Sequence, residues 1–486
     1  MNDHPGERGA DRRTGPPVSA DGLAQAQERM RAAGVASAAI DVFSHYYRQV
    51  ESGATGLIRE DTIEPVLDLP HLDDVQVDPE QAREALARTV MIKLNGGLAT
   101  TMGLDRAKSL LPVHGGLSFL DLAVAQVRAA RATHGVRLPL LLMNSFRTRE
   151  DSLAALAAYP DLAVPGLPWD FLQNSQPKLW ADDLTPVTWP ADPSLEWCPP
   201  GHGDIYTALL SSGILDALLE QGFRYATTSN SDNLGAAPSA TLAGWFAASG
   251  APYAAEVTPR TPADRKGGHL AIRKADGQLI LRDTAQTAPE EMHYFTDEHH
   301  HPYAHTNNLW FDLEVLRATL EERGSVLGLP LIRNTKTVDP TDPASPDVVQ
   351  IETAMGAAIE VFTGARAIVV PRSRFLPVKT TNDLLVLRSD AYDVGDDGVP
   401  RLVVENAPLV DLDPRYYRTM ADFDARFPYG APSLRHATSL TVRGDWTFGA
   451  GVVVSGEVSI DDPGAPGVLA AGGPDHEGGL SPDIRP

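Results

Sequence analysis

The chain has 486 residues, which at roughly 150 residues per domain predicts two or three domains and at least one large hydrophobic core. Its 43% hydrophobic and 22% charged residues are typical of a globular protein and exclude a wholly disordered, collagen-like or coiled-coil chain. The chain carries 41 Lys and Arg against 64 Asp and Glu, and the net charge of −23 has the wrong sign for a protein that wraps nucleic acid or an anionic membrane surface. Any anionic ligand must therefore be held by a few local positive groups.

Cys198 is the only cysteine, which excludes an internal disulfide and every multi-cysteine metal site. A single cysteine in a chain of this length fits a reducing compartment, so we expect a cytoplasmic protein. The N-terminus offers no apolar run for a signal peptide, and no later stretch reaches the ~18 consecutive apolar residues of a membrane span. We expect neither a membrane nor a nucleic acid as partner.

The first 88 residues divide into two parts. Residues 1–21 are polar and rich in Pro, Gly and Arg, and we expect a disordered leader. Residues 22–88 are expected to form a helical extension. Within it, residues 23–50 carry apolar side chains at three- and four-residue spacing, which predicts one or two amphipathic helices with a break near Gly34, and residues 81–89 predict another short helix.

The main domain is expected to span residues 89–392. It opens with TVMIKL, a buried-strand pattern that runs directly into a glycine-rich loop. Further strand-like runs alternate with helical stretches, which predicts an α/β sheet with crossover connections. The predicted strands lie within residues 137–145, 223–233, 251–257, 268–273, 307–313 and 365–371, and the longest helical stretches are residues 117–135 and 204–222.

The C-terminal domain is expected to span residues 393–486, where helical signals become rare. Short β-branched runs are separated by Gly and Asp at regular intervals in its last part. Such a pattern indicates a sandwich edge, a small barrel or a β-solenoid, and it does not choose among them. The strands could pair between subunits of a homo-oligomer or simply cap the core.

The strongest local feature is LNGGLATTMGLDRAKS, which runs from Leu94 to Ser109. Glycines allow consecutive backbone N–H groups to approach phosphate oxygens, and Lys108 beyond the loop adds a positive charge. The spacing matches neither a Walker loop nor the dinucleotide fingerprint. Composition alone is equally compatible with a tight turn and with a phosphate-binding loop.

The amino-acid sequence of this loop resembles the nucleotide-binding loop of the eukaryotic-type UTP–glucose-1-phosphate uridylyltransferases, also called UDP-glucose pyrophosphorylases. Further blocks follow in the order of that family and extend the resemblance from about residue 90 to the end of the chain. These blocks are LMNSF (142–146), PPGHGDIY (199–206), SNSDNLGA (229–236), HTNNLW (305–310), QIETAMGAAI (350–359) and VPRSRFLPVKTTNDLL (370–385).

The resemblance implies a role for each matched position. Lys108 and Lys379 would be the catalytic phosphate-binding lysines, and Asp232 would hold Mg²⁺. The nucleotide would be bound by Leu94, Asn95, Gly96, Gly97, Lys108, Gln173, Gly201, Asn230, Asp232 and Lys379, and the sugar phosphate by His202, Asn230, Asn308 and Glu352. Several positions depart from the family: Ala99 replaces a usual Gly, Cys198 a usual Tyr, Asp283 a usual Glu, and Asp105-Arg106-Ala107 a common Lys-Gly-Pro. Ala99 is tolerable only if its φ is negative, and Cys198 is not expected to be catalytic.

The residues themselves allow other readings. Asp232 follows a predicted strand, where open α/β sheets place ligands and where a carboxylate can hold Mg²⁺, but an aspartate there also caps helices and forms turns. His202 could equally be a solvated bystander, and Lys379 could belong to a structural ion-pair cluster with Arg372 and Arg374. An amide such as that of Gln173 offers the donor and acceptor that a uracil edge needs.

For the fold, the resemblance implies a Rossmann-like α/β nucleotidyltransferase domain of the GT-A type followed by a C-terminal left-handed β-helix. For the activity, it implies the formation of UDP-glucose and pyrophosphate from UTP and glucose 1-phosphate. A broader UDP-sugar or UDP-N-acetylhexosamine pyrophosphorylase and a catalytically silent nucleotide-sugar scaffold are the alternatives. The presence of Lys108, Asp232 and Lys379 together argues against the scaffold.

Overall fold

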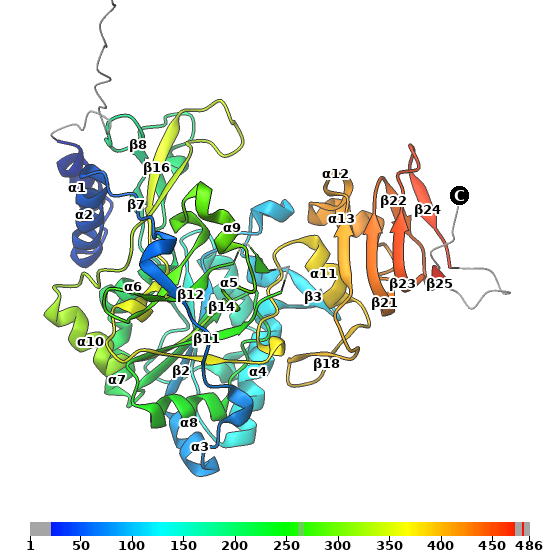
Figure 1. Ribbon diagram of the computed structural model, residues 1–486, viewed down its shortest axis with the longest axis horizontal. Coiled ribbons are helices and arrows are strands. Elements are labelled where there is room, and N and C mark those ends of the chain that lie inside the picture. Colours follow the sequence, from blue (N-terminus) through cyan, green and yellow to red (C-terminus); the bar gives the residue numbers. More distant parts are fainter. Residues whose placement is uncertain (1–20, 262–263, 266, 472–478, 481–486) are drawn as a thin grey trace, which may run out of the picture.

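The computed structural model describes residues 21–261, 264–265, 267–471 and 479–480. Figure 1 shows a large α/β body, a pair of N-terminal helices on one flank, and a β-strand domain that projects from the opposite side. All of the expected leader except Asp21 lies outside the described residues. In the part of the chain that is described, no helix is both long and apolar enough to cross a membrane.

The N-terminal segment contains the expected helices. Helices α1 (Gly22–Ala32) and α2 (Ser37–Glu51) are separated at Gly34, whose φ of 74° ends the first helix, and α3 (Pro79–Ala87) follows. The segment is not purely helical, however, because β1 (Ile63–Pro65) pairs with a strand of the large sheet. Residues 22–88 are thus an integral part of the main fold.

A ten-stranded mixed sheet lies at the centre, as the alternating pattern predicts. The main order is β1-β12-β14-β10-β2-β5-β6; β13 pairs with β12, and β11 pairs with β14 and β17. Strands β10, β2, β5 and β6 are mutually parallel, so their carboxyl ends lie along one edge. The bounds are β2 (Thr89–Asn95), β5 (Leu140–Asn144), β6 (Asp170–Leu172), β10 (Tyr225–Asn230), β11 (Tyr253–Pro259), β12 (His269–Arg273), β13 (Leu279–Arg282), β14 (Tyr303–Asp312) and β17 (Arg366–Val369).

Helices cover both faces of this sheet. Successive residues of β2 alternate between two hydrophobic clusters, with Val90 and Ile92 in one and Met91 in the other. The first cluster is completed by α6 (Ile205–Ser211), α7 (Ile214–Glu220) and α10 (Leu313–Glu322), and the second by α3, α4 (Phe119–His134), α5 (Arg149–Leu156) and α8 (Ala240–Ser249). The predicted helical stretch 204–222 is divided into α6 and α7 because Gly213 adopts a φ of 74°.

Smaller sheets surround the body. The hairpin of β15 (Ile332–Thr337) and β16 (Asp347–Glu352) pairs with β8 (Leu179–Trp180) and lies beside α1 and α2 in Figure 1. Tyr47 of α2 shares a hydrophobic cluster with Leu179 and Val349 of that sheet. The remaining short elements are β3 (Pro112–His114), β4 (Leu117–Ser118), β7 (Gln176–Pro177), β9 (Trp197–Cys198), α9 (Met292–Phe295) and α11 (Thr381–Arg388).

Most of the C-terminal domain is a stack of parallel strands, preceded by the antiparallel pair β18 and β19. Strands β20, β21, β23 and β25 pair in that order and in parallel, and β22 pairs with β24 in the same way. Sequential parallel pairing is what the β-solenoid alternative predicts. The elements are β18 (Tyr392–Val394), β19 (Pro400–Leu402), β20 (Leu409–Leu412), α12 (Pro414–Tyr417), α13 (Met420–Arg426), β21 (Ser433–Val442), β22 (Trp446–Phe448), β23 (Val453–Ile460), β24 (Gly467–Leu469) and β25 (Gly479–Leu480).

Candidate active site

The parallel strands bring most of the predicted nucleotide-binding positions to one edge of the sheet. In the strand register Leu94 lies opposite Asn230, at the carboxyl ends of β2 and β10. The predicted residues at this edge are Leu94, Asn95, Gly96 and Gly97 at the end of β2, Asn230 and Asp232 at the end of β10, and Gln173 after β6. This is the position at which open α/β sheets bind ligands.

The glycine loop folds back on itself. Leu98 and Ala107 form an isolated antiparallel bridge, and the backbone N–H of Lys108 donates to the Gly97 carbonyl oxygen at 3.2 Å. Ala99 has a φ of −83°, so the methyl group that replaces the family's glycine hydrogen costs no backbone strain. The closed loop therefore brings Lys108 next to Gly96 and Gly97, which precede it by twelve and eleven positions.

Lys108 and Asp232 form an ion pair at this edge. The Lys108 Nζ lies 2.6 Å from the Asp232 Oδ2, and each side chain is 17% exposed. The pair is therefore largely shielded by protein and yet open to a ligand. It joins the glycine loop to the turn after β10 and brings together the lysine and the carboxylate that the sequence assigned to phosphate and metal.

Gln173 lies between the two glycine-containing loops. An added Cβ on Gly96 would stand 2.7 Å from the Gln173 Oε1, so the Gln173 amide lies directly against Gly96. The Gln173 Nε2 donates to the Gly201 carbonyl oxygen at 2.9 Å. Three of the predicted nucleotide-binding residues are thereby in direct contact.

The PPGHGDIY loop is held by the end of β16. Gly201 has a φ of 79°, and an added Cβ would meet the Thr353 carbonyl oxygen at 2.5 Å. The His202 Nδ1 accepts a hydrogen bond from the Met355 backbone N–H at 3.0 Å, which leaves the proton of the neutral ring on Nε2. Burial lowers the pKa of His202, although the charges of Asp283 and Glu352 act in the opposite direction. The imidazole is a neutral donor at its Nε2.

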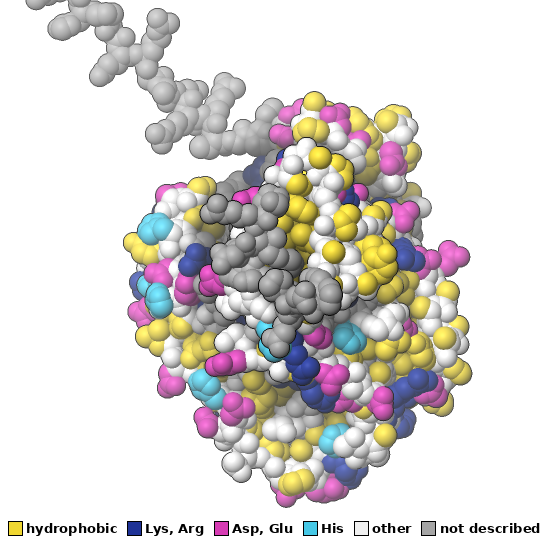
Figure 2. All heavy atoms as spheres, turned by 90° about the vertical axis from the view of Figure 1, so that its right-hand side faces the viewer, with side chains coloured by type: hydrophobic (Ala, Val, Ile, Leu, Met, Phe, Trp, Pro, Cys, Tyr) yellow, Lys and Arg dark blue, Asp and Glu magenta, His cyan; other side chains and the backbone are white. Residues whose placement is uncertain are grey.

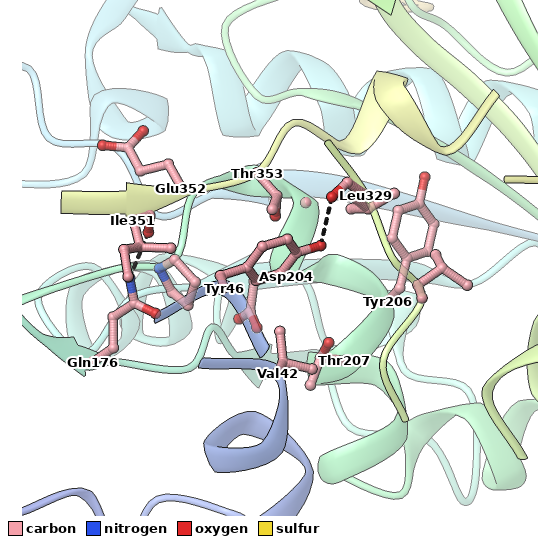
Figure 3. A pocket seen from close by; sticks show the side chains of 13 residues that line it. Val42, Tyr46, Gln176, Asp204, Tyr206, Thr207, Leu329, Ile351, Glu352 and Thr353 are labelled. Atoms are coloured by element: carbon pink, nitrogen blue, oxygen red, sulfur yellow. Dashed lines mark hydrogen bonds between the residues drawn. The ribbon is translucent and has the colours of Figure 1, made fainter. Parts of the chain in front are cut away.

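Asp204 in the same loop is a buried carboxyl group that the sequence reasoning did not single out. It accepts hydrogen bonds from the Asn174 backbone N–H at 2.6 Å and from the Asn174 Nδ2 at 2.9 Å, which anchors the residue next to Gln173. Burial raises the pKa of Asp204 to about 7. Figure 3 shows Asp204 beside Tyr46 of α2 in a cavity of about 20 Å³, room for roughly one water molecule, so this cavity supports the loop and does not hold a substrate.

Two predicted asparagines turn their side chains inward. The Asn95 Nδ2 donates to the Asn144 Oδ1 at 2.7 Å and to the Ser152 Oγ at 2.8 Å. Asn308 is 1% exposed and donates to the Glu256 carboxylate and to the Arg374 carbonyl oxygen. Glu352, in contrast, is half-buried and points away from Asp204 in Figure 3.

Lys379 is exposed and is not part of the ion pair of Lys108 and Asp232. It lines a cavity of about 430 Å³ between the segment 372–379 and residues 400–408, and neither Lys108 nor Asp232 lines that cavity. The segment is nevertheless attached to the Asp232 turn, because Asn233 forms an isolated bridge with Pro377. Lys379 therefore follows Pro377 by two residues, and Pro377 contacts Asn233, the residue next to Asp232.

Two buried charged side chains, Lys93 and Glu256, were missed. Lys93 of β2 is 2% exposed and donates to the Ser229 Oγ at 2.9 Å and to the Ala236 carbonyl oxygen at 3.2 Å. Burial, with a smaller effect of the Arg374 charge, lowers the pKa of Lys93 to about 7. Glu256 of β11 is fully buried against Arg374. The signal was present in the sequence, because both Lys93 and Glu256 interrupt apolar strand runs.

Asn307 was also missed. It has a φ of 58°, which is strained for a residue with a side chain, and such strain is concentrated at ligand sites. Its Oδ1 lies 3.1 Å from the His305 Nδ1.

Cys198 is buried, and burial raises the pKa of its thiol to about 12, in agreement with its exclusion from catalysis.

Comparison with known proteins identifies the family. The family model described as UTP--glucose-1-phosphate uridylyltransferase matches residues 40–455. The UTP--glucose-1-phosphate uridylyltransferase of Solanum tuberosum is 38% identical over 408 residues, 83% of this chain and 83% of the relative. That of Saccharomyces cerevisiae is 38% identical over 379 residues, 77% of this chain and 74% of the relative.

Solved structures give the same result. A mutant of the Leishmania major UDP-glucose pyrophosphorylase in complex with UDP-glucose has a TM-score of 0.87 at 42% identity, covering 94% of this chain and 97% of that chain. The UDP-glucose phosphorylase of Trypanosoma brucei has a TM-score of 0.86 at 41% identity, covering 96% and 99%. The chain belongs to the UTP–glucose-1-phosphate uridylyltransferase family.

Proposed function

We propose that the protein forms UDP-glucose and pyrophosphate from UTP and glucose 1-phosphate. The observation that carries the proposal is the contact of Lys108 with Asp232 beside the glycine loop, at the ligand-binding edge of the sheet. The names of the relatives and the UDP-glucose bound in a homologous structure support the same reaction.

The reaction requires no protein nucleophile. A phosphate oxygen of glucose 1-phosphate attacks the α-phosphorus of UTP, a new P–O bond forms, and the bond to the bridging oxygen breaks so that pyrophosphate leaves. The attacking phosphate is already ionised at neutral pH. The protein therefore acts by positioning the two substrates and by stabilising negative charge.

Each contact has a proposed role in that scheme. The backbone amides of Gly96 and Gly97 hold the nucleotide, and Gln173 pairs with the uracil edge. Lys108 and Lys379 offset phosphate charge, and the neutral His202 donates its Nε2 proton to the sugar phosphate. On the sugar side, Asn230 and Glu352 would contact glucose directly, whereas the buried Asn308 would act by positioning the strained Asn307.

Mg²⁺ is part of the proposal. Mg²⁺ prefers oxygen ligands and is commonly bound through one or two carboxylates together with substrate phosphates. Asp232 fits that requirement, because its carboxylate is 17% exposed at the edge where the phosphates would lie. When bound there, the ion would neutralise part of the charge that the two substrates bring together.

The test is an assay of pyrophosphate release with UTP, ATP and TTP, each combined with glucose 1-phosphate or N-acetylglucosamine 1-phosphate. We expect turnover with UTP and glucose 1-phosphate to exceed every other pair. Turnover with the N-acetylated sugar at an equal or higher rate would assign the protein to the other pyrophosphorylase class, and no release from any pair would make it a scaffold. Lys379→Ala should lower kcat by ~10²-fold or more with an unchanged melting temperature.

The C-terminal stack carries two further proposals. We propose that its sequential parallel strands form a left-handed β-helix, the fold that the resemblance to the family implies for this domain. We also propose that it mediates self-association, because Leu409, Tyr429 and Val468 are each at least 70% exposed and hydrophobic side chains gather on this face in Figure 2. Light scattering of the protein and of Val468→Lys tests the second point.

The reaction would take place in the cytoplasm, where Cys198 stays reduced.

A further inference from the structure

Three potential metal ligands, Glu60, His300 and His301, converge outside the glycine loop and outside the residues assigned to the substrates. Glu60 belongs to a short turn of helix, Glu60–Thr62, before β1, and His300 and His301 lie just before β14. The Glu60 Oε1 is 2.9 Å from the His300 Nε2 and 3.1 Å from the His301 Nε2. The three ligand atoms all lie within 4.8 Å of one another.

The two imidazoles are positioned by their own backbone. The Asp297 Oδ1 accepts from the His299 and His300 backbone N–H groups at 2.9 and 3.3 Å, and the Asp297 carbonyl oxygen accepts from the His301 N–H at 3.0 Å. The His301 ring also stacks on His269, with ring centroids 3.7 Å apart. The turn therefore fixes the backbone of both histidines, and the stacking on His269 holds the His301 ring before any ligand binds.

The carboxylate is fixed as well. The fully buried Arg282 binds the Glu60 Oε2 with one guanidinium nitrogen and the Glu291 Oε2, at 2.7 Å, with the other. This leaves the Glu60 Oε1 directed at the two imidazoles. A ligating carboxylate whose second oxygen is hydrogen-bonded is the usual arrangement around protein-bound metals.

The local charge favours a cation. Arg59 pairs with Glu290 at 2.7 Å and with Glu291 at 3.0 Å, so three carboxylates, those of Glu60, Glu290 and Glu291, face the two guanidinium groups of Arg59 and Arg282. The three carboxylates and two guanidinium groups together carry a formal charge of −1. The two Nε2 atoms meet at one carboxylate oxygen, where a divalent cation would neutralise the remaining charge.

We propose that Glu60, His300 and His301 bind a divalent transition metal of the Zn²⁺ class at a site separate from the nucleotide site. Two imidazole nitrogens and one carboxylate, with a fourth position open to water, are a known Zn²⁺ ligand set, whereas Mg²⁺ prefers oxygen ligands. Ligand atoms around a tetrahedral Zn²⁺ with bonds of ~2.0–2.1 Å are about 3.3 Å apart. The Glu60 Oε1 lies within a few tenths of an ångström of that separation from each imidazole, and the two Nε2 atoms, which lie within 4.8 Å of each other, would close to it around the ion.

The bound metal would connect two distant segments. Glu60 precedes β1, the strand that attaches the N-terminal segment to the large sheet, and His301 precedes β14 in the same sheet. A shared ion would therefore fasten the N-terminal segment to the catalytic domain. We expect the metal to raise the melting temperature of the protein and to leave its uridylyltransferase kcat unchanged.

The test uses the full chain after removal of metals with a chelator. Titration with Zn²⁺ by calorimetry and with Co²⁺ by visible absorption should give one tight site per chain, with the strong absorption of a Co²⁺ ion of low coordination number. His300→Ala and His300→Gln, which change a side chain that is 36% exposed, should weaken binding at least 10-fold.

Two matched controls sharpen the result. His299→Ala removes an exposed imidazole from the same turn and should leave binding intact, and Asp232→Asn should also leave it intact, which separates this site from the nucleotide site. Absence of Zn²⁺ binding would overturn the proposal. An affinity that His300→Ala leaves unchanged, or that His299→Ala lowers equally, would overturn it too.

Discussion

The ammonium of Lys108 lies 2.6 Å from the carboxylate of Asp232, although the two residues are 124 positions apart in the sequence. Lys108 is proposed to hold phosphate and Asp232 to hold Mg²⁺. In this structure the two side chains pair with each other, so each neutralises the charge of the other. Binding of the nucleotide must rearrange the pair. The overall charge of −23 makes this local arrangement important, because the field of the whole protein repels both substrates.

Lys108→Met should have opposite effects on metal binding and on turnover. Without the competing ammonium, Asp232 should bind a divalent cation several-fold more tightly in the absence of nucleotide. The same change should lower kcat by ~10²-fold, because charge on the phosphates is no longer offset. Paramagnetic titration with Mn²⁺ measures the first effect and steady-state kinetics the second.

Lys274→Met is the matched control, since it removes an exposed lysine whose ammonium donates to the Asp61 carbonyl oxygen and not to Asp232. It should change neither quantity. If Lys108→Met leaves the Mn²⁺ affinity as it is in the unmodified protein, the ion pair does not oppose metal binding.

Gly201→Ala and Gly213→Ala should differ strongly although both glycines have positive φ values, 79° and 74°. At Gly213 an added Cβ meets nothing within 4 Å, so the cost is that of the backbone alone, about 1–2 kcal/mol. At Gly201 the Cβ would stand 2.5 Å from the Thr353 carbonyl oxygen and must displace the loop. We expect kcat/KM to fall more than 10-fold for Gly201→Ala and less than 3-fold for Gly213→Ala. Equal effects on kcat/KM would show that the contact with Thr353 does not hold the loop in place.

Much of the fold could be predicted from the sequence because strand-forming runs and glycine breaks are local signals. TVMIKL became β2, and Gly34 separates α1 from α2. The edge position of Asp232 followed from its place directly after a strand run. The resemblance supplied residue roles, and contacts such as those among Gly96, Gln173 and Gly201 now bring several of those residues together.

Long-range pairing could not be predicted. Lys93 and Glu256 stand out as charges in apolar strands, yet nothing local indicates that Arg374 approaches Glu256 from 118 positions away. Nor does the glycine loop reveal that Ala99 and Met102 share a hydrophobic cluster with Leu440 of the C-terminal strands. Such partners are set by strand register and domain packing, which a periodicity in the sequence does not encode.

The buried carboxyl group of Asp204 should make stability depend on pH. Burial raises its pKa from 3.8 to about 7 in the folded protein, despite the two hydrogen bonds from Asn174 that favour the carboxylate. In the unfolded chain the group ionises near its ordinary value. The stabilising effect of the protonated form is therefore complete below about pH 4 and is lost as the pH rises to about 7.

Asp204→Asn should remove this dependence. Between pH 5 and pH 7 the unfolding free energy of the unmodified protein should fall relative to that of the variant by up to ~1.4 kcal/mol per pH unit. Urea unfolding at several pH values measures the difference. Asp216→Asn, at an exposed position of α7, should leave the pH dependence unchanged, and the interpretation fails if the two variants behave alike.

The pair of Glu256 and Arg374 should be the most sensitive charged contact below the site. Glu256 is 0% exposed and accepts two hydrogen bonds from the Arg374 guanidinium, at 2.7 and 3.0 Å. The Arg374 carbonyl oxygen also accepts hydrogen bonds from Asn233 and Asn308, so the pair supports the turn that carries Asp232. Arg374→Met leaves a buried carboxylate without its counter-ion and should cost about 3–5 kcal/mol of stability.

Arg317→Met provides the comparison on the surface. Arg317 pairs with the exposed Asp216 and Glu321, and its loss should cost no more than about 1 kcal/mol. The double variant Glu256→Gln, Arg374→Met should recover part of the lost stability, because the uncompensated charge is gone, but its kcat should stay low since the turn at Asp232 has lost its support. Chemical denaturation and kinetics of the three variants measure both effects. Recovery of kcat together with stability would show that the pair serves the fold and does not position Asp232.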